Sequence, residues 1–419
     1  MTRTERQQEA VKHWIAAKGK GTVEGCTGVG KTRIGLMTIK ALLKKYPEFR
    51  ILVVVPTTAL KDQWQVQLDE WGFSFNSEVQ VINTIIKHTW FCDFLILDEC
   101  HRFSSTDFSQ IFNCVKYKLI LGLTATFERL DGKHTIMQKY CPIVDRITFA
   151  EALVNGWVAD YKEYIVLLDV DNISDYKALN KEWSEHFEFF QFNFDLAMSM
   201  VKPGIGWKNK LAYRDELYKG DDDKKKKEIL GAINYHSVRF MQTMQLRKSF
   251  INNHPKKIEI AKKIIEARLD KKIITFSNNV NMAEAIGIGD VYTGRVSKKR
   301  SATMIEEFNA AETGVLNTCA KANEGLDIRG LSVAIILGTD SSETKARQRR
   351  GRTVRKEGNK IAEVFYIIIR NTTEEKWVKN NHKTDSNYIT IDENGLEQVL
   401  RGEVPDLYRP KLGQIMFRF

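Results

Sequence analysis

The sequence lacks the cysteine patterns of small metal-bound or disulfide-bonded proteins. Its 419 residues include 6 cysteines, with no C-x-x-C pair and no regular spacing between them. A zinc knuckle or a disulfide framework is therefore not expected. Cysteines without such a pattern are typical of proteins in a reducing, intracellular environment.

Long apolar segments are also absent. No apolar signal-peptide core follows Thr2–Arg6, and no apolar run approaches the roughly 20 residues that a bilayer-spanning helix needs. We therefore expect a soluble intracellular protein that acts away from membranes. If a phage encodes it, the compartment would be the bacterial or host cytoplasm, with the nucleus as an alternative. No short-period repeat or low-complexity tract occurs.

The chain is long and carries a net positive charge. A chain of 419 residues is too long to fold around one ordinary hydrophobic core and suits two or three domains. Its hydrophobic content of 43% is that of a globular protein. The 64 lysines and arginines outnumber the 53 acidic residues, which gives a formal net charge of +11. This excess favours a polyanionic partner, either nucleic acid or an anionic membrane.

Two regions alternate apolar strands with helical stretches, which predicts α/β domains built on parallel sheets with covering helices. We place the first domain at residues 1–150 and the second at 251–380, followed by a C-terminal extension at 381–419. The buried strands are predicted at Ile51–Val55, Phe94–Leu97 and Leu119–Leu123 in the first domain, and at Lys272–Phe276, Val315–Cys319, Val333–Leu337 and Val364–Ile369 in the second.

The segment between them, residues 151–250, differs in character. A strand is predicted at Tyr164–Val170, and the rest is mostly helical and rich in aromatic residues. Four aromatic residues recur at spacings of three and four, which predicts one helical face: Trp183, Phe187, Phe190 and Phe194. Packing of an accessory helical layer is the favoured interpretation, and a base-stacking surface is the alternative. The charged run Asp221–Lys227 is predicted to be a solvated loop or helix start.

A glycine-rich segment near the N-terminus matches the phosphate-loop pattern G-x-x-x-x-G-K-[ST] at every fixed position, from Gly25 to Thr32. Its glycines allow backbone N–H groups to face a triphosphate, and the positive N-terminal end of the following helix adds to the attraction. Lys31 would reach the β- and γ-phosphates of ATP, while the Thr32 hydroxyl would ligate Mg²⁺. The backbone of Gly25, Thr27, Gly28 and Gly30 completes the predicted nucleotide site.

Two carboxylates follow the apolar strand Leu95–Leu97. Ligands collect at the carboxyl edge of parallel sheets, so Asp98 and Glu99 are placed where a nucleotide would lie. We expect Asp98 to hold Mg²⁺ and Glu99 to orient and deprotonate the attacking water. The alternative, that these acids merely end a strand in solvent, is disfavoured because the phosphate loop lies upstream at a suitable distance.

A basic segment at Gln348–Arg355 reads Q-R-x-G-R-x-x-R when only its defining positions are kept. Arg352 and Arg355 are three residues apart, hence neighbours on a helical face. Their planar guanidinium groups can stabilise charge on a transferring phosphoryl group. Nuclear targeting or nonspecific nucleic-acid contact is the alternative use of such a cluster.

These segments, with the signature Asp98-Glu99-Cys100-His101, resemble the DExH-box branch of the superfamily 2 helicases. The resemblance covers the chain except for residues 170–250 and the region beyond 380. It implies two RecA-like domains in tandem, with a mostly helical insert between them and an ATP site shared by both. In such a site Arg352 and Arg355 act as arginine fingers, and Gln348 faces the γ-phosphate and its attacking water.

Other segments resemble further motifs of this family. The resemblance assigns adenine recognition to Gln7, with Gln8 as an alternative, and contact with the ATP site to Gly325 and Asp327. It assigns coupling of the ATP site to strand binding to Thr124 and Thr126. The implied nucleic-acid contacts are Pro56, Thr57, Thr84, Ser277, Gly294 and Thr318. Family members usually have a Thr or Ser hydroxyl where Cys319 stands, and the adjacent Thr318 is assigned that contact instead.

The motif spacing resembles that of branch-migrating phage helicases and of DNA-opening helicases in excision repair. It therefore implies ATP- and Mg²⁺-dependent unwinding or branch migration of single-stranded, forked or branched DNA, with 3′ to 5′ polarity. The protein would act as a monomer beside other replication, recombination or repair proteins, and its compactness is common in viral members. An RNA helicase and a non-unwinding double-strand translocase are the alternatives. No nuclease constellation is evident outside these motifs.

Overall fold

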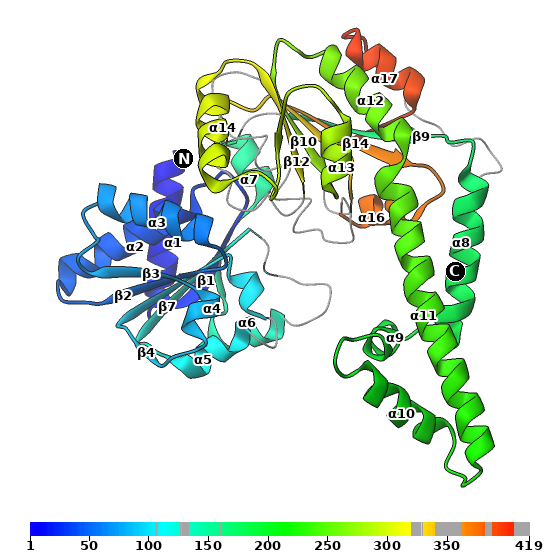
Figure 1. The fold of residues 1–419 in the computed structure, drawn as a ribbon. Helices are drawn as coiled ribbons and strands as arrows, with labels where there is room; N and C mark the ends of the chain where they lie inside the picture. The colour runs from blue at the N-terminus through cyan, green and yellow to red at the C-terminus, as the bar shows by residue number, and fades with distance from the viewer. Residues whose placement is uncertain are drawn as a thin grey trace.

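The computed structural model describes residues 1–104, 108–125, 127, 134–158, 161–319, 328, 330–339, 362–381 and 388–405. Within them the chain forms a six-stranded sheet of order β3-β2-β5-β7-β1-β8 and a seven-stranded sheet of order β11-β12-β10-β13-β14-β9-β15 (Figure 1). Every pairing in both sheets is parallel, which confirms the predicted α/β class.

The first sheet contains the three strands predicted for this domain. Its strands are β1 (Lys20–Gly25), β2 (Ile51–Val55), β3 (Ser77–Val81), β5 (Phe94–Asp98), β7 (Leu119–Thr124) and β8 (Ile143–Ile147). The central strands β2 and β5 are buried along their whole length, as expected for apolar strands covered on both faces. The short strands β4 (Trp90–Phe91) and β6 (Val115–Lys116) pair separately.

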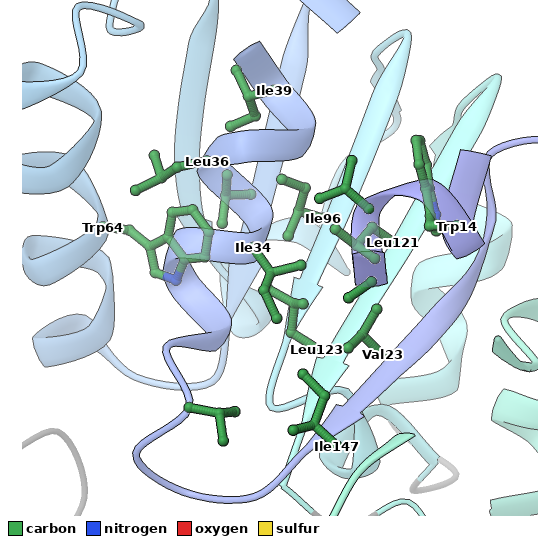
Figure 2. Close-up of a cluster of buried hydrophobic side chains, with 14 of the residues drawn as sticks. Trp14, Val23, Ile34, Leu36, Ile39, Trp64, Ile96, Leu121, Leu123 and Ile147 are labelled. Carbon is green, nitrogen blue, oxygen red and sulfur yellow. The ribbon is translucent and has the colours of Figure 1, made fainter. Parts of the chain in front are cut away.

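Helices cover both faces of this sheet. On one face lie α1 (Arg3–Ala16), α2 (Lys31–Lys45) and α3 (Thr58–Glu70). In Figure 2, Ile34 of α2 and Trp64 of α3 lie over Ile96 and Leu123 of the sheet. The other face packs Phe103, Ile111 and Met137 from the segments around α4 (Ile82–Ile85), α5 (Ile111–Cys114) and α6 (His134–Tyr140).

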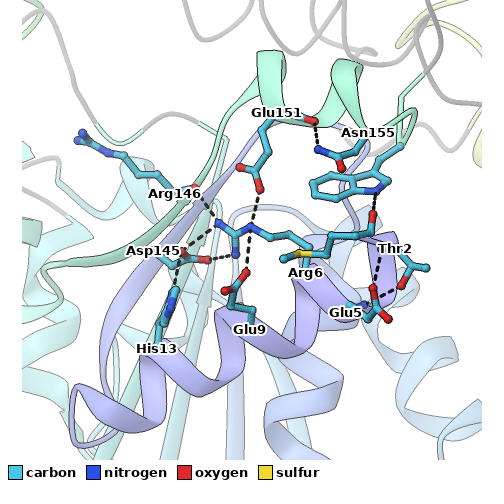
Figure 3. A network of polar contacts seen from close by, with 11 residues as sticks. Thr2, Glu5, Arg6, Glu9, His13, Asp145, Arg146, Glu151 and Asn155 are labelled. Atoms are coloured by element: carbon cyan, nitrogen blue, oxygen red, sulfur yellow. Dashed lines mark hydrogen bonds and ion pairs between the residues drawn. The ribbon is translucent and has the colours of Figure 1, made fainter.

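A buried ionic network fixes α1 against the edge strand β8 and helix α7 (Phe149–Val154) (Figure 3). Arg6 donates two hydrogen bonds to Asp145, of 2.7 and 3.0 Å, and one of 2.6 Å to Glu151. His13 also lies 3.0 Å from Asp145. Burial works against the charge of Arg6, but the hydrogen bonds that it donates to both carboxylates raise its pKa above the usual value. The network thus holds α1, and with it the neighbouring Gln7, in a fixed position.

We expect Arg6→Met to destabilise the first domain by about 3–5 kcal/mol, because it leaves the buried Asp145 beside His13, which is a weaker partner than Arg6. Urea unfolding of the variant and of the wild type measures this difference. Arg401→Met is the matched control, since Arg401 forms an exposed ion pair with Glu403 and its loss should leave the free energy of unfolding nearly unchanged. Equal effects of the two substitutions would contradict the structural role given to Arg6.

The second sheet contains the four strands predicted for it and three more. Its strands are β9 (Tyr161–Leu168), β10 (Lys272–Ser277), β11 (Asp290–Tyr292), β12 (Gly314–Cys319), β13 (Val333–Ile336), β14 (Ala362–Ile369) and β15 (Tyr388–Ile391). One face is covered by α14 (Lys298–Ala310) and α16 (Thr373–Asn381), and the other by α12 (Pro255–Glu266), α13 (Val280–Ala285) and α17 (Glu393–Leu400).

The strand predicted at Tyr164–Val170 belongs to this second sheet, not to the segment between the domains where we had placed it. It forms β9, which pairs with β14 on one side and with β15 on the other. Because β9 is buried on both faces, it needs neighbours on both edges, and the second sheet provides them. Residues 388–391 form β15, the neighbour on the other edge of β9, and so belong to this sheet. We had expected them in a C-terminal extension that starts at residue 381.

The insert forms a helical arm, defined here as residues 173–253. It comprises α8 (Ile173–Glu188), α9 (Phe194–Met200), α10 (Gly206–Leu217) and α11 (Asp223–Asn253). In Figure 1, α8 and α11 run side by side away from the second sheet, with α9 and α10 at the far end. As predicted, Asp221–Lys227 contains a helix start, where Asp222 caps α11. Within the described residues, no helix is both long and apolar enough to cross a bilayer.

The aromatic residues of the insert pack against one another, as the favoured interpretation held. Trp183, Phe187, Phe190 and Phe194 all lie against Phe240 of α11, with ring centroids 5.3–6.5 Å apart. They do not share a single helix as predicted, because α8 ends at Glu188 and a turn precedes α9. The stripe is thus the core of the arm's helical layer.

Candidate nucleotide-binding and hydrolysis site

The phosphate loop connects β1 to α2 at the carboxyl edge of the first sheet. Gly28 and Gly30 have φ values of 95° and 84°, a left-handed conformation that favours glycine. A Cβ atom on Gly30 would lie 2.5 Å from Nε2 of Gln7, so this position also lacks room for a side chain. Lys31 begins α2, and its Nζ donates a 3.2 Å hydrogen bond to the carbonyl of Gly25. The loop and helix end together form an anion-binding cradle.

Gln7 lies directly beside this loop. Its side-chain N–H donates a 2.7 Å hydrogen bond to the carbonyl of Val29, and the residue is 2% exposed. Its Oε1 atom is buried without a hydrogen-bond partner. Gln8, the alternative, is exposed. Of the two glutamines, the structure thus brings Gln7 to the nucleotide loop.

Asp98 ends β5 at the same edge of the sheet, beside Leu123 of β7 in the strand register. Nε1 of Trp64 donates a 2.8 Å hydrogen bond to its Oδ2, and the backbone N–H of Glu99 donates one of 2.9 Å to Oδ1. Burial, followed by the charge of Glu99, raises the pKa of Asp98 to about 6, although the Trp64 hydrogen bond and Lys31 act in the opposite direction. Trp64 therefore supports the charged form of this carboxylate.

Glu99 is held in an uncommon backbone conformation. Its φ of 50° lies in the left-handed region, which costs a non-glycine residue energy and often marks a functional site. Its Oε2 is buried and has no hydrogen-bond partner. Nδ1 of His101 lies 3.5 Å from this oxygen. A buried carboxylate oxygen without a donor is suited to accept a hydrogen bond from a bound water.

His101 connects this carboxylate to the neighbouring strand. Its Nδ1 lies 2.9 Å from the hydroxyl of Thr124, the last residue of β7, and both side chains are buried. The predicted coupling residue Thr124 is therefore in contact with the site through His101. We had quoted His101 only as part of a signature and had given it no role. Its position two residues after Glu99, at the sheet edge, was the available signal.

Removal of the indole donor to Asp98 should change the pH dependence of ATP turnover. The bond stabilises the charged carboxylate, so Trp64→Phe should raise the pKa of Asp98 further. The acid limb of the pH–rate profile should then move to higher pH. Trp90→Phe is the matched control, because the indole N–H of Trp90 is buried without a partner. An unshifted acid limb in Trp64→Phe would contradict this role for Trp64.

Four of the six predicted nucleic-acid contacts lie at or near the surface. Pro56 and Thr57 follow β2, and Thr57 also caps α3 by accepting from the N–H of Leu60. Thr84 is exposed on α4, after β3. Gly294 is exposed, and no atom lies within 4 Å of where its Cβ would be.

The structure contradicts the other two contacts. Ser277 and Thr318 are fully buried at the ends of β10 and β12. The Ser277 hydroxyl lies within hydrogen-bond distance of the carbonyls of Asn279 and Thr318, and the Thr318 hydroxyl donates to the carbonyl of Thr275. Both strands are covered on both faces, so neither hydroxyl faces solvent. These side chains stabilise the sheet and do not offer a phosphate contact.

The remaining predicted site residues lie outside the described part of the chain. They are Thr126, Gly325, Asp327, Gln348, Arg352 and Arg355. The described residues that flank them are Ala125 and Phe127, Cys319 and Ile328, and Thr339 and Ala362.

Comparison with known families agrees with this site. The profile of a family described as "Type III restriction enzyme, res subunit" matches residues 1–89 and 77–129, and that of "Helicase conserved C-terminal domain" matches residues 256–357. The chain belongs to the superfamily 2 helicases. The family hydrolyses ATP with a divalent metal, and the matched ranges contain both the phosphate loop and the Q-R-x-G-R-x-x-R segment of this helicase.

Several curated relatives align with most of this helicase. The DNA 3'-5' translocase XPB2 of Sulfurisphaera tokodaii is 26% identical across 88% of this chain and 82% of the relative. The putative ATP-dependent RNA helicase MJ1505 of Methanocaldococcus jannaschii is 24% identical across 84% of this chain and 56% of the relative. Putative helicase 22 of a Sulfolobus islandicus filamentous virus is 21% identical across 93% of this chain and 67% of the relative.

The fold has solved counterparts. The structure of S. cerevisiae Dbp5 bound to RNA and ADP BeF3 superposes with a TM-score of 0.59 at 11% identity, covering 94% of this chain and 91% of that chain. The DNA-bound restriction-modification enzyme LlaBIII gives a TM-score of 0.57 at 14% identity over 94% of this chain and 32% of that chain. These similarities support two RecA-like domains in tandem in this helicase.

The residues of the first domain fit ATP and a divalent metal. The positive φ of Gly28 and Gly30 forms a cradle that side chains would fill. The buried oxygens of Gln7 and Glu99 that have no hydrogen-bond partner can be satisfied by an adenine and by a water. Asp98 supplies an oxygen ligand beside Lys31, and such oxygens are the ligands that Mg²⁺ prefers.

Proposed function

We propose that this helicase is an ATP-driven motor that translocates on DNA and unwinds or branch-migrates it, in replication, recombination or repair. The observation that carries the proposal is the arrangement at one sheet edge, where the phosphate loop, Asp98 and Glu99 lie beside the His101–Thr124 contact. A DNA translocase is also among the relatives that align with most of the chain. By analogy with the family, the direction is 3′ to 5′.

Each residue of the site has a distinct task in hydrolysis. Lys31 binds the phosphates and Gln7 binds the adenine, while Thr32 and Asp98 hold Mg²⁺, which neutralises phosphate charge when bound. Glu99 accepts a hydrogen bond from the attacking water at Oε2 and takes its proton. Gln348 of the second domain orients this water. Arg352 and Arg355 stabilise the charge that spreads over the transferring phosphoryl group. Hydrolysis thus needs both domains together.

The site is coupled to strand binding through the sheet edge. Thr124 contacts His101, which lies next to Glu99, so a shift at the end of β7 changes the surroundings of the catalytic base. Pro56, Thr57 and Thr84 on the first domain and Gly294 on the second contact the backbone of the strand. Opening and closing of the two domains then moves the strand by one step in each cycle. Because such contacts go to phosphates, binding should tolerate many sequences and weaken with salt.

One panel of substrates tests this function. ATP turnover is measured with single-stranded DNA, forked DNA, a four-way junction and RNA, beside strand displacement on the same fork. Forked or branched DNA should stimulate turnover most and should be separated. Stimulation by RNA alone would overturn the DNA assignment and favour an RNA helicase, the activity named for one relative.

A second candidate is a translocase that moves on duplex DNA without separating it. The translocase name of one relative and the restriction-enzyme family of the first domain favour it. Displacement of a third strand from a DNA triplex reports such movement. Triplex displacement without fork unwinding would support this candidate over the helicase activity.

A further inference from the structure

The linker between the two domains begins beside the phosphate loop. It is defined here as residues 148–158, which follow β8 and include α7. The backbone N–H of Cys26 in the loop donates a 3.0 Å hydrogen bond to the carbonyl of Ile147, the last residue of β8. The Cys26 thiol donates a 3.7 Å hydrogen bond to the carbonyl of Thr148, whose side chain caps α7. The start of the loop and the start of the linker are therefore bonded to each other.

The end of the linker packs on the middle of the same loop. Val158 is 2% exposed, and its Cγ1 lies 3.1 Å from where a Cβ atom on Gly28 would be. Val29, the next residue of the loop, is buried in one hydrophobic cluster with Trp157 and Val158. The backbone N–H of Trp157 donates a 2.8 Å hydrogen bond to the carbonyl of Ala152, which connects the end of the linker to α7. Because Gly28 shapes the phosphate cradle, the linker contacts the loop where a nucleotide would bind.

The linker also touches the second domain directly. Phe149 of α7 packs against the hydrophobic cores of both domains, and α7 lies between the two sheets in Figure 1. The ring of Phe149 meets that of Tyr161 edge to face, with centroids 5.3 Å apart and an interplanar angle of 82°. Tyr161 is the buried first residue of β9 and pairs with Ala362 of β14. One short helix therefore joins the phosphate loop to the second sheet.

A nucleotide would act on this loop at its first residue. Nζ of Lys31 donates its hydrogen bond to the carbonyl of Gly25, so a triphosphate that binds Lys31 competes with this bond. Gly25 lies at the point where β1 pairs with the end of β8, directly before Cys26. Close-packed side chains such as Val158 and Phe149 cannot accommodate a shift of their neighbours without moving themselves. The loop, the linker and β9 thus form one continuous packed path.

We propose that the linker couples the phosphate loop to the second domain, and that Val158 and Phe149 are positioning residues that make domain closure depend on bound nucleotide. The inference rests on the ATP binding and the domain closure proposed above. Coupling between two binding sites is reciprocal, so nucleic acid that binds the closed domains strengthens nucleotide binding by the same factor. The two linker residues set the size of this factor, which is measurable without hydrolysis.

The test uses the full chain and mant-AMPPNP, a fluorescent ATP analogue that is not hydrolysed. Its Kd is measured without nucleic acid, with forked DNA and with RNA, so that the result does not depend on which of the two the protein prefers. The variants are Val158→Ala and Phe149→Leu, one at each end of the path. Val158→Thr keeps the branched side chain, and Val154→Ala is the matched control, because Val154 is 86% exposed at the end of α7. Amide hydrogen exchange of residues 152–158 and thermal unfolding are recorded for each protein.

In the wild type, the analogue should slow exchange at residues 152–158, and nucleic acid should lower its Kd by at least about fivefold. Val158→Ala and Phe149→Leu should each reduce this factor to about twofold or less, because the packed path is interrupted. Their Kd without nucleic acid should stay within about threefold of the wild type, since the loop backbone and Lys31 still bind the phosphates. Val158→Thr and Val154→Ala should keep the wild-type factor, although the buried hydroxyl of Val158→Thr lowers its unfolding temperature.

A wild-type factor in either Val158→Ala or Phe149→Leu would overturn the coupling through the linker. Unchanged exchange at residues 152–158 when the analogue binds would overturn the connection between nucleotide and linker. A factor that falls in step with the unfolding temperature, Val158→Thr included, would contradict a positioning role. Failure of the proposed function appears in the wild type, as no binding of the analogue or no response of its Kd to either nucleic acid, and it overturns this inference as well. Failure of the inference alone leaves that wild-type response intact.

Discussion

Lys31→Ala is expected to abolish ATP turnover. The ammonium group lies at the start of α2, inside the cradle formed by Gly28 and Gly30, where its charge would face the β- and γ-phosphates. Loss of such a preorganised group typically costs at least about 100-fold in rate. The measurement is phosphate release at saturating ATP, with and without forked DNA.

The matched control is Lys40→Ala, which removes a lysine from the exposed side of the same helix. Its turnover should equal that of the wild type. Unfolding of Lys31→Ala should also be close to that of the wild type, because Lys31 is only partly buried and its hydrogen bond to Gly25 contributes about 1 kcal/mol. Normal turnover in Lys31→Ala would refute the whole assignment of the nucleotide site.

Arg355→Ala is expected to leave ATP binding intact and to remove hydrolysis. The prediction rests on the sequence pattern of residues 348–355, in which Arg355 corresponds to an arginine finger of the family. Arginine fingers contribute about 10³- to 10⁵-fold to phosphoryl transfer, far more than they contribute to ground-state binding. Single-turnover hydrolysis measures the chemical step, and fluorescent-nucleotide titration measures binding.

Arg349→Ala provides a control within the same basic segment, because Arg349 has no assigned catalytic role. Its single-turnover rate should remain within about tenfold of the wild type, since only its charge contributes to the local field. A wild-type rate in Arg355→Ala would show that the second domain does not supply the finger. Lost ATP binding in this variant would instead point to a ground-state role for the residue.

The sequence was most informative where local chemistry decides the structure. Strands such as β2 and β5 are continuous apolar runs, so tertiary context has little influence on them. The glycines of the phosphate loop are needed for their backbone conformation, and the positive φ of Gly28 and Gly30 shows the same constraint. Asp98 and Glu99 were placed correctly at the sheet edge, because parallel strands bring their carboxyl ends together.

The sequence was less informative where distant segments meet. The position of β9 between β14 and β15 joins residues about two hundred positions apart, and no local pattern specifies that pairing. The burial of Ser277 and Thr318 depends on the helices that cover both faces of the second sheet. Likewise, the bond from Trp64 to Asp98 depends on how α3 packs on β5. A resemblance to a motif indicates where a residue lies in the chain but not which way its side chain points.

The central claim is that this chain is a nucleic-acid-dependent ATP motor whose site is divided between two domains. The most direct test is the ATP turnover of the full chain with Mg²⁺, measured with and without forked DNA over a range of salt concentrations. We predict turnover that forked DNA increases and that rising salt reduces to the basal rate, because strand contacts go to phosphates. Turnover that is absent, or that is the same with and without nucleic acid at every salt concentration, would contradict the account.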